Sequence, residues 1–110
     1  MPRAATTADA FNAVAEPRRR AILDLLASGE LSVGELVEAL GVAQPQVSKH
    51  LRVLREVGAV AVRGDGRHRR YRLAGDALKP IHDWIRSYEQ FWTERFDALD
   101  AVLDDITTEA

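Results

Sequence analysis

Apolar residues recur at helical spacing along most of this chain, and Gly or Pro interrupts the runs. Near the N-terminus, Asp9 can cap a short helix. Pro17 suits the first turn of a second helix, because that position needs no N–H. The second helix extends to about Ala27, and Ser28-Gly29 ends it. We therefore expect two successive helices in this part of the chain.

The next apolar pattern predicts two short helices joined by a tight turn. Leu31 can form a short strand fragment, and Ser32 and Glu35 after it have the spacing of a capping box. Gly41 supplies the left-handed backbone conformation that ends the first helix. The second helix begins near Gln44 or Pro45, and we expect Gln44 to act as its cap. Residues 33–57 are thus a predicted helix-turn-helix, and the core-facing positions of its second helix are Val47, Leu51 and Leu54.

Two strands are predicted at residues 60–73. Val60 and Val62 alternate with other residues, as in a half-buried strand. Gly64-Asp65-Gly66 is a hairpin turn signal, and the return strand places Tyr71 and Leu73 on one face. A basic hairpin directly after a helix-turn-helix is typical of a winged helix, an arrangement that docks on DNA.

The longest predicted helix runs from about Asp76 to Asp105 and carries an apolar stripe. From Ile81 to Ile106 the stripe would rise about 37 Å, which is more than a chain of this size can cover by itself. We therefore predict a homodimer in which residues 8–15 and 76–106 form the dimerisation helices. The expected interface residues are Phe11, Val14, Trp84, Tyr88, Phe91, Trp92, Phe96, Leu99, Val102 and Leu103.

Together these elements predict a single winged-helix domain over residues 1–110, mainly α with a small β-hairpin and with dimerisation helices at both ends. Residues 1–7 are small and polar, and we expect them to be disordered. The chain has no Cys, which excludes disulfides and thiolate metal sites. It also has no apolar run of the ~20 residues that span a membrane and no signal-peptide pattern, so we expect a cytoplasmic protein without a membrane partner.

The net charge of -2 hides an uneven distribution. Residues 42–72 contain eight Lys or Arg and two acidic residues, a local charge of +6, whereas the remainder carries -8. Attraction to DNA depends on the charge of the local face rather than on the total. The acidic remainder would help to turn the basic face toward the duplex.

Candidate DNA contacts lie on the outer face of the helix from Gln44 and in the hairpin. Gln can pair bidentately with adenine, and Lys prefers guanine acceptors in the major groove. Arg67 at the hairpin tip could enter the minor groove. His50 lies near the edge of the core, so a packed histidine and a DNA contact are both open. The predicted contacts are Gln44, Gln46, Ser48, Lys49, His50, Arg52, Arg67, Arg69 and Arg70.

A run of three arginines, Arg18-Arg19-Arg20, lies at a predicted helix N-terminus, where positive charge is mildly unfavourable. This position suggests a compensating partner. A structural salt bridge is favoured over a phosphate contact.

With these motifs in view, the chain resembles the ArsR/SmtB family of winged-helix transcriptional repressors over nearly its whole length. Residues 15–23, with Glu16-Pro17-Arg18, are similar to the opening motif of the family. Residues 41–54 resemble its recognition unit, and Gly66-Arg67 with Tyr71-Arg72-Leu73 resembles its wing. The resemblance implies a homodimer that blocks transcription by occupying an inverted-repeat operator.

One departure from this family concerns metal binding. Where the family has a Leu-Cys-Val-Cys-Asp-Leu metal motif, this chain has Leu31-Ser32-Val33-Gly34-Glu35-Leu36, which lacks both thiolates. A second site of the family uses paired His and carboxylate residues on the C-terminal helix. Here His82 has Asp83 and Glu89 nearby, but the paired spacing is missing. The chain is therefore similar to a branch without metal-binding cysteines, and we expect no metal site and no cofactor.

Three hypotheses follow, and the first is a sequence-specific DNA-binding regulator whose partner is a double-stranded operator. The second is a winged-helix module whose C-terminal helices bind another protein, without specific DNA binding. The third is an effector-responsive repressor with a small-molecule or metal site at the C-terminal helix, where the aromatic cluster would form the pocket. An enzyme is disfavoured, because the sequence has no glycine-rich phosphate loop and no nucleophile with an evident base.

Overall fold

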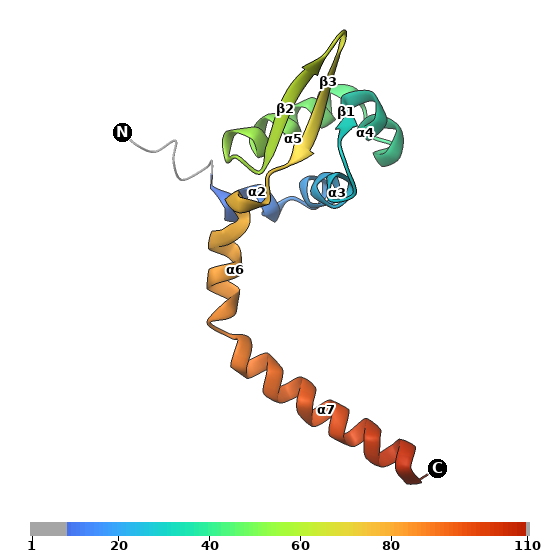
Figure 1. Cartoon of the computed structure of the whole chain (residues 1–110), viewed down its shortest axis with the longest axis vertical. Helices are drawn as coiled ribbons and strands as arrows, with labels where there is room; N and C mark the ends of the chain where they lie inside the picture. The colour runs from blue at the N-terminus through green and yellow to red at the C-terminus, as the bar shows by residue number, and fades with distance from the viewer. Residues whose placement is uncertain (1–8, 110) are drawn as a thin grey trace. The chain divides into compact units, whose positions relative to one another are not determined.

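The computed structural model describes residues 9–109, which belong to two compact units (Figure 1). The first unit ends at Lys79, and the second begins at Pro80. The first unit is a winged helix, with helices and a small antiparallel sheet, and the second is helical. The disorder expected for residues 1–7 lies outside the described residues.

The first two helices, α2 (Ala10–Ala15) and α3 (Pro17–Leu26), both begin at a carboxylate cap. Oδ1 of Asp9 accepts a hydrogen bond from the Asn12 amide at 2.7 Å, and Oε2 of Glu16 accepts one from the Arg18 amide at 2.8 Å. Each carboxylate pairs an amide that the helix itself leaves free. The two predicted helices are confirmed, with Pro17 in the first turn of α3.

The turn between the next helices also follows the prediction. After β1 (Leu31–Ser32), helix α4 (Val33–Leu40) begins with a complete capping box. Oγ of Ser32 accepts from the Glu35 amide at 3.2 Å, and Oε1 of Glu35 accepts from the Ser32 amide at 2.8 Å. Gly41 ends the helix with φ 67° and ψ 30°, the left-handed conformation that lacks a Cβ penalty in glycine.

Helix α5 (Gln44–Glu56) packs one face into the core of the first unit. The exposed fractions of Val47, Leu51 and Leu54 are 0%, 1% and 0%. The expectation that Gln44 caps this helix is wrong. Ala43 occupies the cap position without a side-chain hydrogen bond, and Gln44 is the first helical residue. Pro45 is favourable in this first turn, because no intrahelical bond is lost there.

The sheet contains three antiparallel strands in the order β1-β3-β2 (Figure 1). The predicted hairpin consists of β2 (Val60–Asp65) and β3 (His68–Leu73), and the short β1 adds a third strand on the other edge of β3. Tyr71 in the central strand lies opposite both Leu31 and Val62. Its side chain is buried in the same cluster as Leu51 and Leu54, which joins the wing to α5.

The single long helix predicted from Asp76 to Asp105 is wrong in one respect, because it is interrupted. The segment consists of a 3-10 turn (Gly75–Leu78), α6 (Lys79–Arg86) and α7 (Glu89–Glu109). At the break, Ser87 donates to the Trp84 carbonyl from its amide at 3.2 Å and from its hydroxyl at 2.7 Å. A serine hydroxyl that binds a nearby carbonyl competes with the helical ladder, which explains an interruption without Gly or Pro.

The conformation of Gly41 leads to a matched test of stability. A Cβ on Gly41 would meet no atom within 4 Å, so Gly41→Ala carries only the backbone cost of the left-handed conformation. We expect Gly41→Ala to lower the free energy of unfolding by about 1 kcal/mol. Gly34 in α4 has no positive φ, so Gly34→Ala should instead raise it by about 0.5 kcal/mol.

Urea denaturation followed by circular dichroism, at one protein concentration, measures both variants. Equal effects of the two alanines would contradict a special backbone role for Gly41.

Candidate nucleic-acid interface

The outer face of α5 is polar and exposed along its whole length. The buried positions Val47, Leu51 and Leu54 fix the rotation of the helix about its axis, so the predicted contact residues project away from the core. The predicted contact residues of α5 that are exposed are Gln44, Gln46, Ser48, Lys49 and Arg52.

The start of α5 and the wing contribute to one surface of the first unit. A hollow of about 360 Å³ is lined by Gln44 from α5, by Arg67 and Arg69 from the wing, and by the first turn of α4. Residues that are more than twenty positions apart in the sequence thus come together in this hollow. Gln44, Arg67 and Arg69 are all among the residues that the sequence predicts for DNA contact.

The ring of His50 lies between two charged groups at the start of α3. Its Nε2 is 3.7 Å from Oε2 of Glu16, and its Nδ1 is 3.5 Å from Nη1 of Arg19. The side chain is 14% exposed. These contacts suit a neutral ring whose Nε2–H points toward the carboxylate and whose Nδ1 accepts from the guanidinium. Burial of the ring lowers the pKa of His50; Arg19, Arg18 and Lys49 lower it further, and Glu16 opposes them.

The three consecutive arginines find partners that the sequence analysis missed. Arg19 donates to the carbonyls of Ala13 at 2.7 Å and Asn12 at 3.0 Å, and Arg20 donates to that of Val14 at 2.7 Å. Carbonyls at the end of α2 have no intrahelical partner, so the two side chains compensate them. The favoured salt bridge is thus replaced by backbone contacts for these two residues.

Arg18 has a different partner, and this partner is in α5. Its Nη1 donates to Oε1 of Gln46 at 3.3 Å. The contact joins the start of α3 to one of the predicted base-reading side chains. No spacing rule links positions 18 and 46, so only the packing of α3 against α5 could reveal it.

Two arginines of the sheet are paired with carboxylates beside β1. Nη2 of Arg63 lies 2.9 Å from Oε1 of Glu30, and Arg70 lies 3.7 Å from Glu30 and 3.5 Å from Glu35. The hydrogen bond from Arg63 is the main reason why the pKa of Glu30 is lowered. Hydrogen bonds with Ser32 likewise lower the pKa of Glu35. The pairs hold the base of the wing against α4 and offset part of its positive charge.

The second unit carries a long exposed apolar surface. Those of its large apolar side chains that are exposed have exposed fractions from 45% at Trp92 to 63% at Phe96. Trp84 and Tyr88 meet edge to face with ring centroids 5.7 Å apart, and Arg95 lies 4.5 Å above the ring of Phe91. The other exposed residues of this stripe are Leu99, Val102, Leu103 and Ile106.

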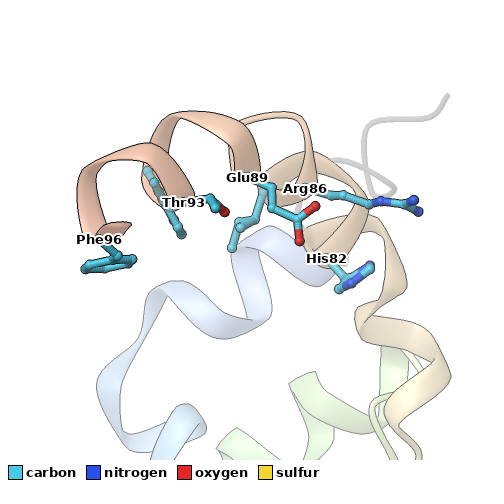
Figure 2. A pocket seen from close by; sticks show the side chains of 7 residues that line it. His82, Arg86, Glu89, Thr93 and Phe96 are labelled. Carbon is cyan, nitrogen blue, oxygen red and sulfur yellow. The ribbon is translucent and has the colours of Figure 1, made fainter. Parts of the chain in front are cut away.

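Two hollows accompany this apolar surface. One, of about 270 Å³, lies where α6 meets α7, and Figure 2 shows the side chains of Arg86, Glu89 and Thr93 around it. The other is broader, about 520 Å³, and is lined by aromatic residues that include Trp84 and Phe91. Within residues 9–109 no group of three His, Asp or Glu side chains is placed to hold a metal ion. In the same part of the chain, no helix has the length and apolarity needed to cross a membrane.

A helix-turn-helix followed by an antiparallel wing defines the class of winged-helix DNA-binding regulators. Comparison with known proteins agrees with this class. Residues 16–62 match the family model described as bacterial regulatory protein, arsR family. The chain is 37% identical to the HTH-type transcriptional regulator Rv2034 of Mycobacterium tuberculosis, over 86% of each chain. It is 30% identical to the transcriptional repressor SdpR of Bacillus subtilis, over 71% of this chain and 87% of the relative.

Solved structures extend the agreement to the fold. The transcriptional repressor BigR of Xylella fastidiosa superposes with a TM-score of 0.60 and 34% identity, over 81% of this chain and 89% of that protein. The chain therefore belongs to the ArsR family. It is a DNA-binding transcriptional regulator of the winged-helix class, and not an enzyme.

The partly buried His50 ring generates a prediction about pH. Its pKa is lower in the folded protein than in the unfolded chain, so the unfolded chain binds the proton first as the pH falls. The stability carried by the neutral ring is complete above the unfolded pKa of about 6.5 and decreases as the pH falls through that value. We expect the parent protein to lose more stability than His50→Gln between about pH 7.5 and pH 5.5.

Urea denaturation at several pH values measures this difference, because carboxylate titration is common to both proteins. His68→Gln, which removes an exposed histidine of the wing, is the control. Parallel pH profiles for the parent and His50→Gln would contradict the packed, neutral ring.

Proposed function

We propose that this protein is a homodimeric, sequence-specific repressor that binds an inverted-repeat operator through α5 and the wing. The observation that carries the proposal is the hollow shared by Gln44 of α5 with Arg67 and Arg69 of the wing. A polar helix face beside an exposed basic hairpin matches the two contacts of a winged helix, one in the major groove and one alongside it. The proposal places the protein in the cytoplasm, with DNA as its partner.

In this arrangement α5 enters the major groove with its N-terminus first. Gln44, Gln46, Ser48 and Lys49 are exposed in the first half of the helix, so they are the side chains proposed to reach base edges. Arg52 lies one turn further and is better placed for phosphate. Because His50 is held by Glu16 and Arg19, we propose that it positions α5 rather than reading a base.

Charge supports the proposed role of the wing tip. Among the described residues, Arg67 and Arg69 have no carboxylate partner, whereas Arg63 and Arg70 are paired with Glu30. An unpaired, exposed guanidinium retains its full attraction for phosphate or for the minor groove. We therefore assign DNA contact to Arg67 and Arg69, and a weaker contribution to Arg70.

The apolar stripe of the second unit supports the dimer. Large side chains that are half exposed along α7 would be costly in an isolated chain, and a second copy of the same stripe would cover them. A two-fold dimer presents two α5 helices in opposite directions. An operator with two inverted half-sites about one helical turn apart then follows.

One prediction from this proposal concerns the reading of base sequence by α5. An operator is selected from random duplexes with the parent protein, and fluorescence anisotropy gives Kd for it and for a scrambled duplex. Gln46→Ala and Lys49→Ala should each reduce the ratio of the two affinities about tenfold, because each removes a base contact.

Arg20→Gln is a control that removes a charge outside the proposed reading face, and it should keep the parent ratio. If the parent showed no preference for any duplex, specific DNA binding would be refuted. Capture of a protein from nuclease-treated lysate would then favour the interaction module.

Another prediction from this proposal concerns the dimer. Leu99 lies within the apolar stripe, so Leu99→Asp should place a charge in the interface and raise the dimer dissociation constant at least about a hundredfold. Ala101→Asp introduces the same charge two positions along, on the opposite side of α7, and should remain dimeric. Sedimentation velocity over a concentration series measures both. Dimerisation of Leu99→Asp at parent strength would place the interface elsewhere.

A further inference from the structure

A second hollow in the first unit lies between α5 and β3. Its volume is about 240 Å³. The helix contributes Ser48, Arg52 and Arg55, whose spacing of four and three residues places them on one helical stripe. The strand contributes Arg69 and Tyr71, which share one face because they are two positions apart.

The residues that line this hollow make it strongly basic. Three guanidinium groups line it, and no acidic residue does. Among the described residues, Arg52, Arg55 and Arg69 form no salt bridge, whereas Arg63 and Arg70 of the same sheet are paired with carboxylates. Like charges that converge without a counter-charge repel one another, and an anion seated between them would relieve this repulsion.

We infer that this hollow binds one phosphodiester group of the DNA backbone, held jointly by Arg55 of α5 and Arg69 of β3. The inference rests on the proposed function, in which α5 occupies the major groove. Guanidinium groups bind phosphate oxygens bidentately. Arg55, which the sequence analysis did not select, thereby becomes a DNA-binding residue.

A shared phosphate would connect the two reading elements through the DNA. Phosphate contacts set the register and orientation of a protein on the duplex, but they carry no base information. The hollow would thus fix the positions of α5 and the wing relative to the DNA backbone. It should contribute equally to binding of every sequence.

The test compares Arg55→Gln and Arg69→Gln with Arg72→Gln. Arg72 is exposed on the same strand as Arg69, but it points to the opposite face of the sheet, so it is a matched loss of charge. Kd for the selected operator and for the scrambled duplex is measured over a range of KCl concentrations. Circular dichroism establishes that each variant is folded.

Arg55→Gln and Arg69→Gln should each weaken binding to both duplexes equally, by about tenfold. Each should also reduce the slope of log Kd against log salt by up to about two, because a dimer contains the hollow twice. The double variant should lose less than the sum of the two single losses, since both side chains hold the same phosphate. Arg72→Gln should leave the slope nearer that of the parent.

Unchanged salt slopes in a protein that still selects its operator would overturn the inference and leave the proposed function intact. A loss of affinity for the operator alone, with unchanged affinity for the scrambled duplex, would also overturn the inference, because that result indicates a base contact. Absence of DNA binding by the parent would instead refute the proposed function. Inorganic phosphate should compete with DNA more strongly than chloride does at equal ionic strength, and this excess should be lost in Arg55→Gln, because both phosphates would occupy the same guanidinium groups.

Discussion

The burial of one face of α5 is the interaction on which the rest of the structure depends. Val47, Leu51 and Leu54 are removed from water against α3, α4 and Tyr71 of the sheet. Burial of three such side chains contributes several kcal/mol, about 1.5–3 for each. It also fixes the orientation of the helix about its own axis. The polar face is therefore presented to solvent as a fixed array. Tyr71 belongs to the same cluster, so the wing is held in register with that array.

Arginine illustrates how local partners change the meaning of a residue type. Arg19 and Arg20 compensate helix carbonyls, and Arg63 and Arg70 are offset by Glu30 and Glu35. Arg55 and Arg69 converge on one hollow without a carboxylate. A positive local charge predicts attraction to DNA, but the distribution of partners decides which side chains remain able to provide it. The net charge of the segment is thus a weaker guide than the pairing of each guanidinium.

Features that depend on neighbours within a few positions could be predicted from the sequence. Features that leave no such local signal could not. The capping box at Ser32 and the left-handed Gly41 depend on neighbours within a few positions, so they could be predicted. The cap expected at Gln44 was wrong, since the first turn accepts Pro45 with no side-chain cap at all. The break at Ser87 was missed because a serine within an apolar period gives no signal until its hydroxyl binds the Trp84 carbonyl.

For residues 9–73 the order of the elements, their approximate ends and the buried face of each follow from the sequence alone, because propensity, capping and periodicity act over a few residues. The candidate contacts on α5 follow in the same way, as the face opposite the core. Tertiary structure alone decided which distant side chains meet: Arg18 with Gln46, His50 with Glu16, and Arg55 with Arg69 around one hollow. Such pairs depend on how α3, α5 and β3 pack together, and no spacing along the chain encodes that packing.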